Sequence, residues 1–182
     1  MKTFLLSNIE KSDRSELEKG VFIVMLHAGR IPPHIGILAG GLYHSLSIKG
    51  RDLDVGFEVL MKSIVQRKIP SLFIQIRPHD MLSPAQISSE FKSEVLGFTR
   101  VDIGMATCLS PLKLFFARHW LLQTENVNYI YELLPLLEQE GLLGRNYECN
   151  METLLEEQTF NLPYYTMTEI NRGIEGVRTE YN

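Results

Sequence analysis

The sequence predicts an α+β protein in which helices surround a small antiparallel sheet. Two continuous apolar runs rich in β-branched residues, 21–27 and 71–77, have the length and composition of buried strands. Between them, two short runs separated by Ala39-Gly40-Gly41 predict a β-hairpin. The chain of 182 residues is long enough for one domain with a sizeable core.

Apolar runs, together with the capping, glycine and proline residues between them, indicate the order of the elements. The predicted strands are 21–27 (VFIVMLH), 34–38 (HIGIL), 42–48 (LYHSLSI) and 71–77 (SLFIQIR). The predicted helices are 14–19, about 52–67, 83–96, 110–122, 124–140 and about 152–158. Asp52 or Asp54 can cap the second of these helices, and Gly141 ends the fifth. The Ser-Pro pairs at 83 and 110 each supply an N-cap followed by a proline at the first helical position.

The charge distribution suggests a boundary near Trp120. Residues 1–120 contain 15 basic and 11 acidic side chains, whereas residues 121–182 contain 3 and 11. We therefore expect a core at 1–120 and an acidic, mainly helical C-terminal extension at 121–182 that packs on it.

Bulk properties argue against several classes of function. A net charge of −4 gives no reason to expect a nucleic-acid partner. The sequence contains no apolar run of membrane-spanning length, and the N-terminus is a poor signal peptide. Two cysteines, Cys108 and Cys149, do not make a disulfide framework, so we expect a cytoplasmic protein. Since no fourth ligand stands at motif spacing from Cys108 and the two hairpin histidines, neither a metal nor another cofactor is expected.

Three residues could carry chemistry: Cys108, His34 and His44. A thiol nucleophile needs a base that takes its proton, and the base needs a third group that orients its ring. Each residue also has an ordinary interpretation, because lone cysteines are often buried and inert and strand histidines often bond to a neighbouring group.

The two histidines can cooperate only if they lie on one face of the hairpin. A two-residue turn would pair His44 with Ile37, on the face opposite His34. A three-residue turn would place His44 against Gly36, diagonally beside His34. The functional interpretation therefore predicts a three-residue turn, in which Gly36 also leaves room beside the His44 ring.

The segment 33–45 (PHIGILAGGLYHS) resembles the two-histidine hairpin of circularly permuted papain-like thiol enzymes. The order of elements matches that of the NlpC-type and lecithin:retinol-acyltransferase-like branches. In that order a first strand is followed by a strand with a histidine, a glycine turn, a second strand with a histidine and a distant cysteine. HIGIL supplies the first histidine, LYHS the second, and GVFIVMLHAGR matches the strand that leads into the hairpin. The similarity covers roughly residues 20–118 and implies a permuted papain-like, NlpC-type architecture.

The resemblance also implies roles. His34 would be the general base and later the acid, His44 would orient it, and Cys108 would attack an acyl carbon to form a thioester. Two features depart from these relatives. The Ser110-Pro111 cap leaves Cys108 two residues outside the first helical turn, where the helix dipole would lower its pKa. The N-C-x-x-F and Cys-Ser-Gly contexts of the two branches are absent from the sequence.

The leading interpretation is a cysteine peptidase- or amidase-like hydrolase, or an acyl-transfer enzyme, that acts on an amide or ester. A peptide or peptidoglycan-type amide is the first substrate expected, and an acyl-bearing lipid, as for an acyltransferase or phospholipase, is the second. The alternative is a non-catalytic binding module on the same fold, with the acidic segment as its partner surface. Nothing in the sequence indicates an oligomeric state.

Overall fold

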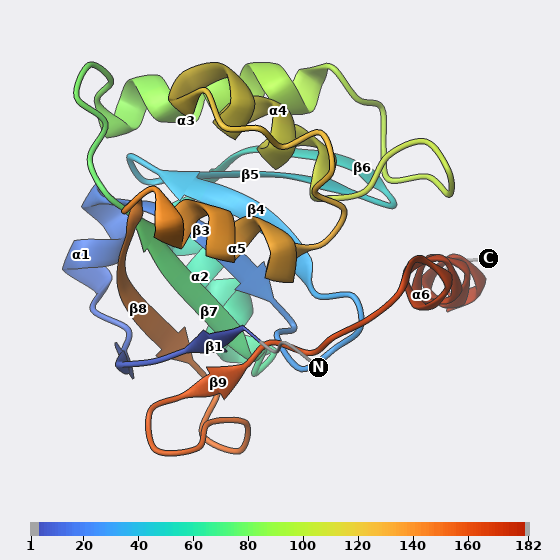
Figure 1. The fold of residues 1–182 in the computed structure, drawn as a ribbon. Coiled ribbons are helices and arrows are strands. Elements are labelled where there is room, and N and C mark those ends of the chain that lie inside the picture. Colours follow the sequence, from blue (N-terminus) through green and yellow to red (C-terminus); the bar gives the residue numbers. More distant parts are fainter. Residues whose placement is uncertain (1–3, 181–182) are drawn as a thin grey trace.

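The computed structural model describes residues 4–180, and its main feature is a seven-stranded mixed sheet. The strands of this sheet are β2 (Ile9–Lys11), β3 (Val21–Leu26), β4 (His34–Ala39), β5 (Leu42–Ser47), β6 (Gly50–Gly56), β7 (Ser71–Ile76) and β8 (Leu143–Cys149). Their spatial order is β2-β8-β7-β3-β4-β5-β6 (Figure 1). Strands β2 and β8 run parallel, and the other neighbours pair antiparallel. A separate antiparallel pair joins β1 (Leu5–Leu6) to β9 (Phe160–Asn161).

Helices cover both faces of the sheet. The helices are α1 (Arg14–Lys19), α2 (Phe57–Gln66), α3 (Pro84–Leu96), α4 (Ser110–Trp120), α5 (Ile130–Gln139) and α6 (Met167–Glu180). Helices α1 and α2 pack on one face, and α3, α4 and α5 pack on the other. Figure 1 shows α6 at the side of the sheet, reached from β9 by an extended segment. Across residues 4–180, each helix is too short or too polar to span a bilayer.

The burial of β3 explains its continuous apolar sequence. Val21, Ile23 and Met25 pack with the α3–α5 layer, whereas Phe22 and Val24 pack with α1 and α2. A strand covered on both faces loses the polar alternation of a half-exposed strand. The α+β class is therefore confirmed, as is the interpretation of this run as a buried strand.

Of the two helix starts predicted at Ser-Pro pairs, the one at Ser83 is confirmed. Ser83 caps α3 and forms a capping box with Gln86, and Pro84 occupies the first turn. At the second pair the predicted Ser110 cap is wrong, because the N-cap is Leu109, without a side-chain cap bond, and Ser110 and Pro111 lie inside the first turn. Helix α4 begins at Ser110, so that Cys108 lies two residues before it.

Other elements differ from the expectation. Residues 52–56, expected to begin a helix, belong to the edge strand β6, and α2 begins only at Phe57. Helix α5 begins at Ile130 rather than near 124, and residues 152–158 form turns rather than a helix. The C-terminal segment, expected to be a polar tail, contains helix α6. The charged residues of β6 were interpreted as helix caps because an exposed edge strand tolerates the same residue types.

The described part of the predicted extension, residues 121–180, does not pack on a finished core as a separate segment. Its strand β8 lies between β7 and β2, and α5 buries Leu133, Leu134 and Leu137 in the main core. The sheet is therefore larger than expected and mixed rather than purely antiparallel. The charge boundary near Trp120 reports the composition of the surface, which does not determine which segments share a sheet.

The hairpin turn contains two residues, and the expected three-residue turn is wrong. Gly40 and Gly41 have φ of 56° and 78°, and Ile37 lies opposite His44. Two successive left-handed residues are the requirement of a tight type I′ turn, which Gly-Gly satisfies without strain. His44 therefore lies on the sheet face opposite His34.

Candidate functional site

A cavity of about 520 Å³ lies at the end of the sheet where β4 begins. Its walls come from the loop between β3 and β4, the turn before α4, the β5–β6 turn and helix α6. Both His34 and Cys108 line it. The fold thus brings together two of the three residues singled out in the sequence.

A chain of hydrogen bonds fixes the His34 ring. Its Nε2 lies 2.9 Å from the Ser45 hydroxyl, which donates to Oδ2 of Asp52 at 3.0 Å. Ser45 and Asp52 are cross-strand partners in β5 and β6. Since the single hydroxyl proton of Ser45 goes to Asp52, Ser45 accepts from His34, and the ring proton resides on Nε2.

This tautomer leaves Nδ1 of His34 with a lone pair. Within residues 4–180, Nδ1 accepts no hydrogen bond. Burial lowers the pKa of His34, Asp52 partly opposes the shift, and His27 adds to it. His34 is therefore a neutral imidazole at neutral pH, the form that can accept a proton.

Cys108 lies in a turn held by its neighbours. The Thr107 hydroxyl accepts from the Leu109 amide at 3.2 Å, and the Ser110 hydroxyl accepts from the Thr107 amide at 3.0 Å. The half-buried Cys108 thiol lies 3.8 Å from the Pro33 carbonyl oxygen, to which it donates. In this geometry Cys108 is a protonated thiol.

The electrostatics of Cys108 contain two opposing contributions. Burial raises the pKa of the Cys108 thiol, whereas the backbone N–H groups of Ile35, Leu109 and Cys108 itself oppose the shift. The rise prevails, so the resting side chain is not a thiolate. Transfer of its proton to Nδ1 of His34 requires the sulfur to leave the Pro33 carbonyl.

His44 is placed elsewhere. It is fully buried, its Nε2 lies 2.8 Å from the Ser88 hydroxyl of α3, and its Nδ1 accepts from the Asp54 amide at 3.1 Å. Both ring nitrogens are satisfied, and burial lowers the pKa of His44. The expectation that His44 orients His34 is wrong, because the two-residue turn separates them by the thickness of the sheet.

The space at Gly36 serves a different side chain from the one expected. A Cβ at Gly36 would lie 2.6 Å from the Tyr43 ring and 2.6 Å from the His44 carbonyl oxygen. Gly36 therefore makes room for the Tyr43 ring, which packs with α1 and α2, and not for the His44 ring. The Tyr43 hydroxyl is buried and has no hydrogen-bond partner among the described residues.

Sequence reasoning missed Ser45 and Asp52 as partners of His34. In a two-residue hairpin, His34 and Ser45 are diagonal neighbours on one face, so the correct turn length would have identified Ser45. Asp52 could not be identified in this way, because its segment was expected to be a helix.

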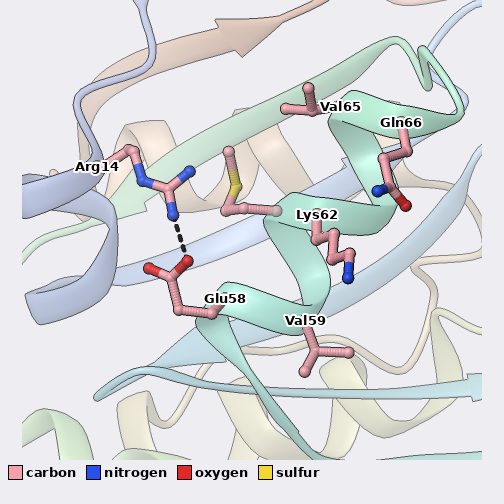
Figure 2. A pocket seen from close by; sticks show the side chains of 7 residues that line it. Arg14, Glu58, Val59, Lys62, Val65 and Gln66 are labelled. Atoms are coloured by element: carbon pink, nitrogen blue, oxygen red, sulfur yellow. Dashed lines mark hydrogen bonds and ion pairs between the residues drawn. The ribbon is translucent and has the colours of Figure 1, made fainter.

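A second hollow of about 470 Å³ lies on the outer face of α2 (Figure 2). Arg14 of α1 and Glu58 form an ion pair beside it, and Val59 and Val65 are exposed there. Its lining contains neither cysteine nor histidine. In the described part of the chain, no cluster of three or more His, Cys, Asp or Glu residues could hold a metal ion.

The comparisons with known proteins gave no relative. No family model matches the chain, and neither a curated protein nor a solved structure matches it.

Proposed function

We propose that the cavity at the start of β4 is the site of a thiol-dependent hydrolase or acyl-transfer reaction on an amide or ester. The observation that carries the proposal is the His34–Ser45–Asp52 chain, which fixes the proton on Nε2 and leaves a lone pair on Nδ1 of a histidine that lines the same cavity as Cys108. In this proposal Ser45 and Asp52 take the orienting role that the resemblance implies for His44.

The reaction follows from these groups. Nδ1 of His34 takes the thiol proton, and the Cys108 sulfur forms a bond to the acyl carbon. The C–N or C–O bond then breaks, the leaving amine or alcohol takes the proton from His34, and a thioester remains. His34 next takes a proton from water, or from an acyl acceptor, whose oxygen bonds to the acyl carbon as the C–S bond breaks. The departing Cys108 sulfur then takes that proton from His34, which restores the thiol and the neutral imidazole. Backbone N–H groups near Cys108 would stabilise the oxyanion of each tetrahedral intermediate.

The substrate proposed first is a peptide or peptidoglycan-type amide, and an acyl-bearing lipid is second. Membership in the permuted papain-like superfamily is part of the same proposal and rests on the hairpin sequence. A reducing, cytoplasmic setting would keep Cys108 and Cys149, both free thiols, available.

A binding module without catalysis is the second candidate. It is favoured by the Cys108 thiol, which donates to the Pro33 carbonyl and has a raised pKa. The two candidates differ in whether Cys108 accepts an acyl group.

Acylation by 4-nitrophenyl butyrate, followed by intact-protein mass spectrometry, separates the candidates. The Cys149→Ser chain should gain one butyryl group, and Cys108→Ser should gain none. His34→Ala should slow acylation about 100-fold at pH 7, the usual contribution of a general base. The loss should shrink at pH 10, where hydroxide removes the thiol proton.

Two results would contradict the catalytic proposal. One is equal acylation of the Cys108→Ser and Cys149→Ser chains. The other is an acylation rate at Cys108 that His34→Ala leaves unchanged at pH 7. Either result would leave the binding module as the better account of the cavity.

A further inference from the structure

The charge of the cavity differs in sign from that of the chain. The protein as a whole has a net charge of −4. Of the Lys, Arg, Asp and Glu side chains that line the cavity, however, Arg30, Lys49 and Arg67 are basic and Asp52 alone is acidic. Asp52 already accepts the Ser45 hydroxyl. The cavity therefore favours an anionic ligand.

Two of the basic groups come from different segments of the chain. Arg30 lies in the loop between β3 and β4, and Arg67 is the residue at the C-terminal cap of α2. Both are exposed, and neither forms an ion pair with an acidic residue in the part of the chain that the structure describes. A guanidinium group presents a planar set of donors that matches a carboxylate. These arginines are thus available to a ligand.

Branched aliphatic side chains form a large part of the rest of the cavity wall. Helix α6 contributes Ile170, Ile174 and Val177, which lie three to four residues apart on one helical face. Ile48 and Ile130 line the wall from the β5–β6 turn and from α5. Such a surface gains free energy by burying methylene groups.

We propose that the ligand is an anionic amphiphile: an amide or ester of an apolar acyl chain whose leaving group bears a carboxylate, as in an N-acyl amino acid. The acyl chain lies along the α6 wall, and the carboxylate binds Arg30 and Arg67. This inference rests on the proposed function, because it assigns the acyl carbonyl to Cys108.

Binding is measured by calorimetry on the full chain carrying Cys108→Ser, which prevents turnover. N-decanoylglycine should bind about tenfold more tightly than the neutral N-decanoylglycinamide, since the two differ only in the carboxylate. Arg30→Gln and Arg67→Gln should each lower the affinity for N-decanoylglycine about three- to tenfold and leave the neutral amide unaffected. Shortening the acyl chain should weaken binding roughly fourfold per methylene group.

Lys62→Gln is the matched control. This substitution also removes one positive charge, from α2 itself, whose C-terminal cap is Arg67. Lys62 lines the hollow on the outer face of α2 and not this cavity (Figure 2). Lys62→Gln should leave the affinity unchanged, and Arg67→Lys should retain part of it. A folded Arg67→Gln chain, shown by an unchanged melting temperature, is required for the comparison.

Several outcomes would overturn the inference: equal affinity for the acid and the neutral amide, equal effects of Lys62→Gln and Arg67→Gln, or an affinity independent of chain length. Tighter binding of decyl phosphate than of N-decanoylglycine would contradict the proposed carboxylate and indicate a phosphate as the anionic group of the ligand. Carboxylate-dependent binding without acylation at Cys108 would contradict the proposed function alone. Acylation at Cys108 without carboxylate-dependent binding would contradict this inference alone.

Discussion

His34 and His44 belong to one hairpin, yet the sheet gives them different roles. His34 is half-buried at the start of β4, lines the cavity and keeps one ring nitrogen without a partner among the described residues. His44 is fully buried, and both of its nitrogens are bonded. A turn longer by one residue would place both histidines on the same face of the sheet. The order of residues along the chain therefore does not decide which histidine can act with Cys108.

The largest expected effect comes from removing the buried histidine. His44→Ala should lower the free energy of unfolding by about 2–4 kcal/mol, because it leaves a cavity and removes the partners of Ser88 and the Asp54 amide. Chemical denaturation of the wild type and the variant measures the difference.

His34→Ala is the matched variant. It should cost less than about 1 kcal/mol, because the side chain is half-buried and only one nitrogen is bonded. If the two variants were equally destabilised, the distinction between a structural and an available histidine would be wrong.

Much of the fold could be predicted because local signals agreed with the final structure. The apolar run at β3, the hairpin of β4 and β5 and the Ser83 cap are each determined by nearest neighbours along the chain. Strand β8 could not be predicted in the same way, because its sequence LGRNYEC is polar and it is stabilised by β7 and β2, which are distant in sequence.

The residues of the candidate site also differ in whether local sequence predicts them. His34 and Cys108 were identified from residue type and order, and both line one cavity. Ser45 and Asp52 depend on the register of β4, β5 and β6, which a single strand does not encode. The expected role of His44 requires a three-residue turn, but two adjacent glycines with positive φ favour the shorter turn, which places His44 on the other face.

The second prediction tests the packing between the two histidines. Gly36→Ala should destabilise the protein by about 1–3 kcal/mol, because its Cβ would overlap the Tyr43 ring and the fixed His44 carbonyl. Gly176→Ala in α6 is the control, since a Cβ there has nothing within 4 Å and alanine favours a helix. Thermal unfolding of both variants measures the difference. A Gly36→Ala chain as stable as Gly176→Ala would contradict the register in which Tyr43 covers Gly36.

The smallest expected effect is on the pH dependence of the free energy of unfolding, and its sign follows from the burial of the two histidines. Burial lowers the pKa of both His34 and His44 in the folded protein, from an ordinary value of 6.5. As the pH falls below that value, the unfolded chain takes up protons first, so the free energy of unfolding should decrease from pH 7 to pH 5. Above pH 7 both states are neutral at these positions, and the contribution is fully present.

Protonation of His44 would break its bond from the Asp54 amide, whereas protonation of His34 at Nδ1 breaks no bond to a described residue. His44→Gln should therefore flatten the pH dependence more than His34→Gln, in urea titrations repeated at each pH. Equal flattening would mean that burial alone, and not the hydrogen bonds of His44, sets the difference between the two histidines.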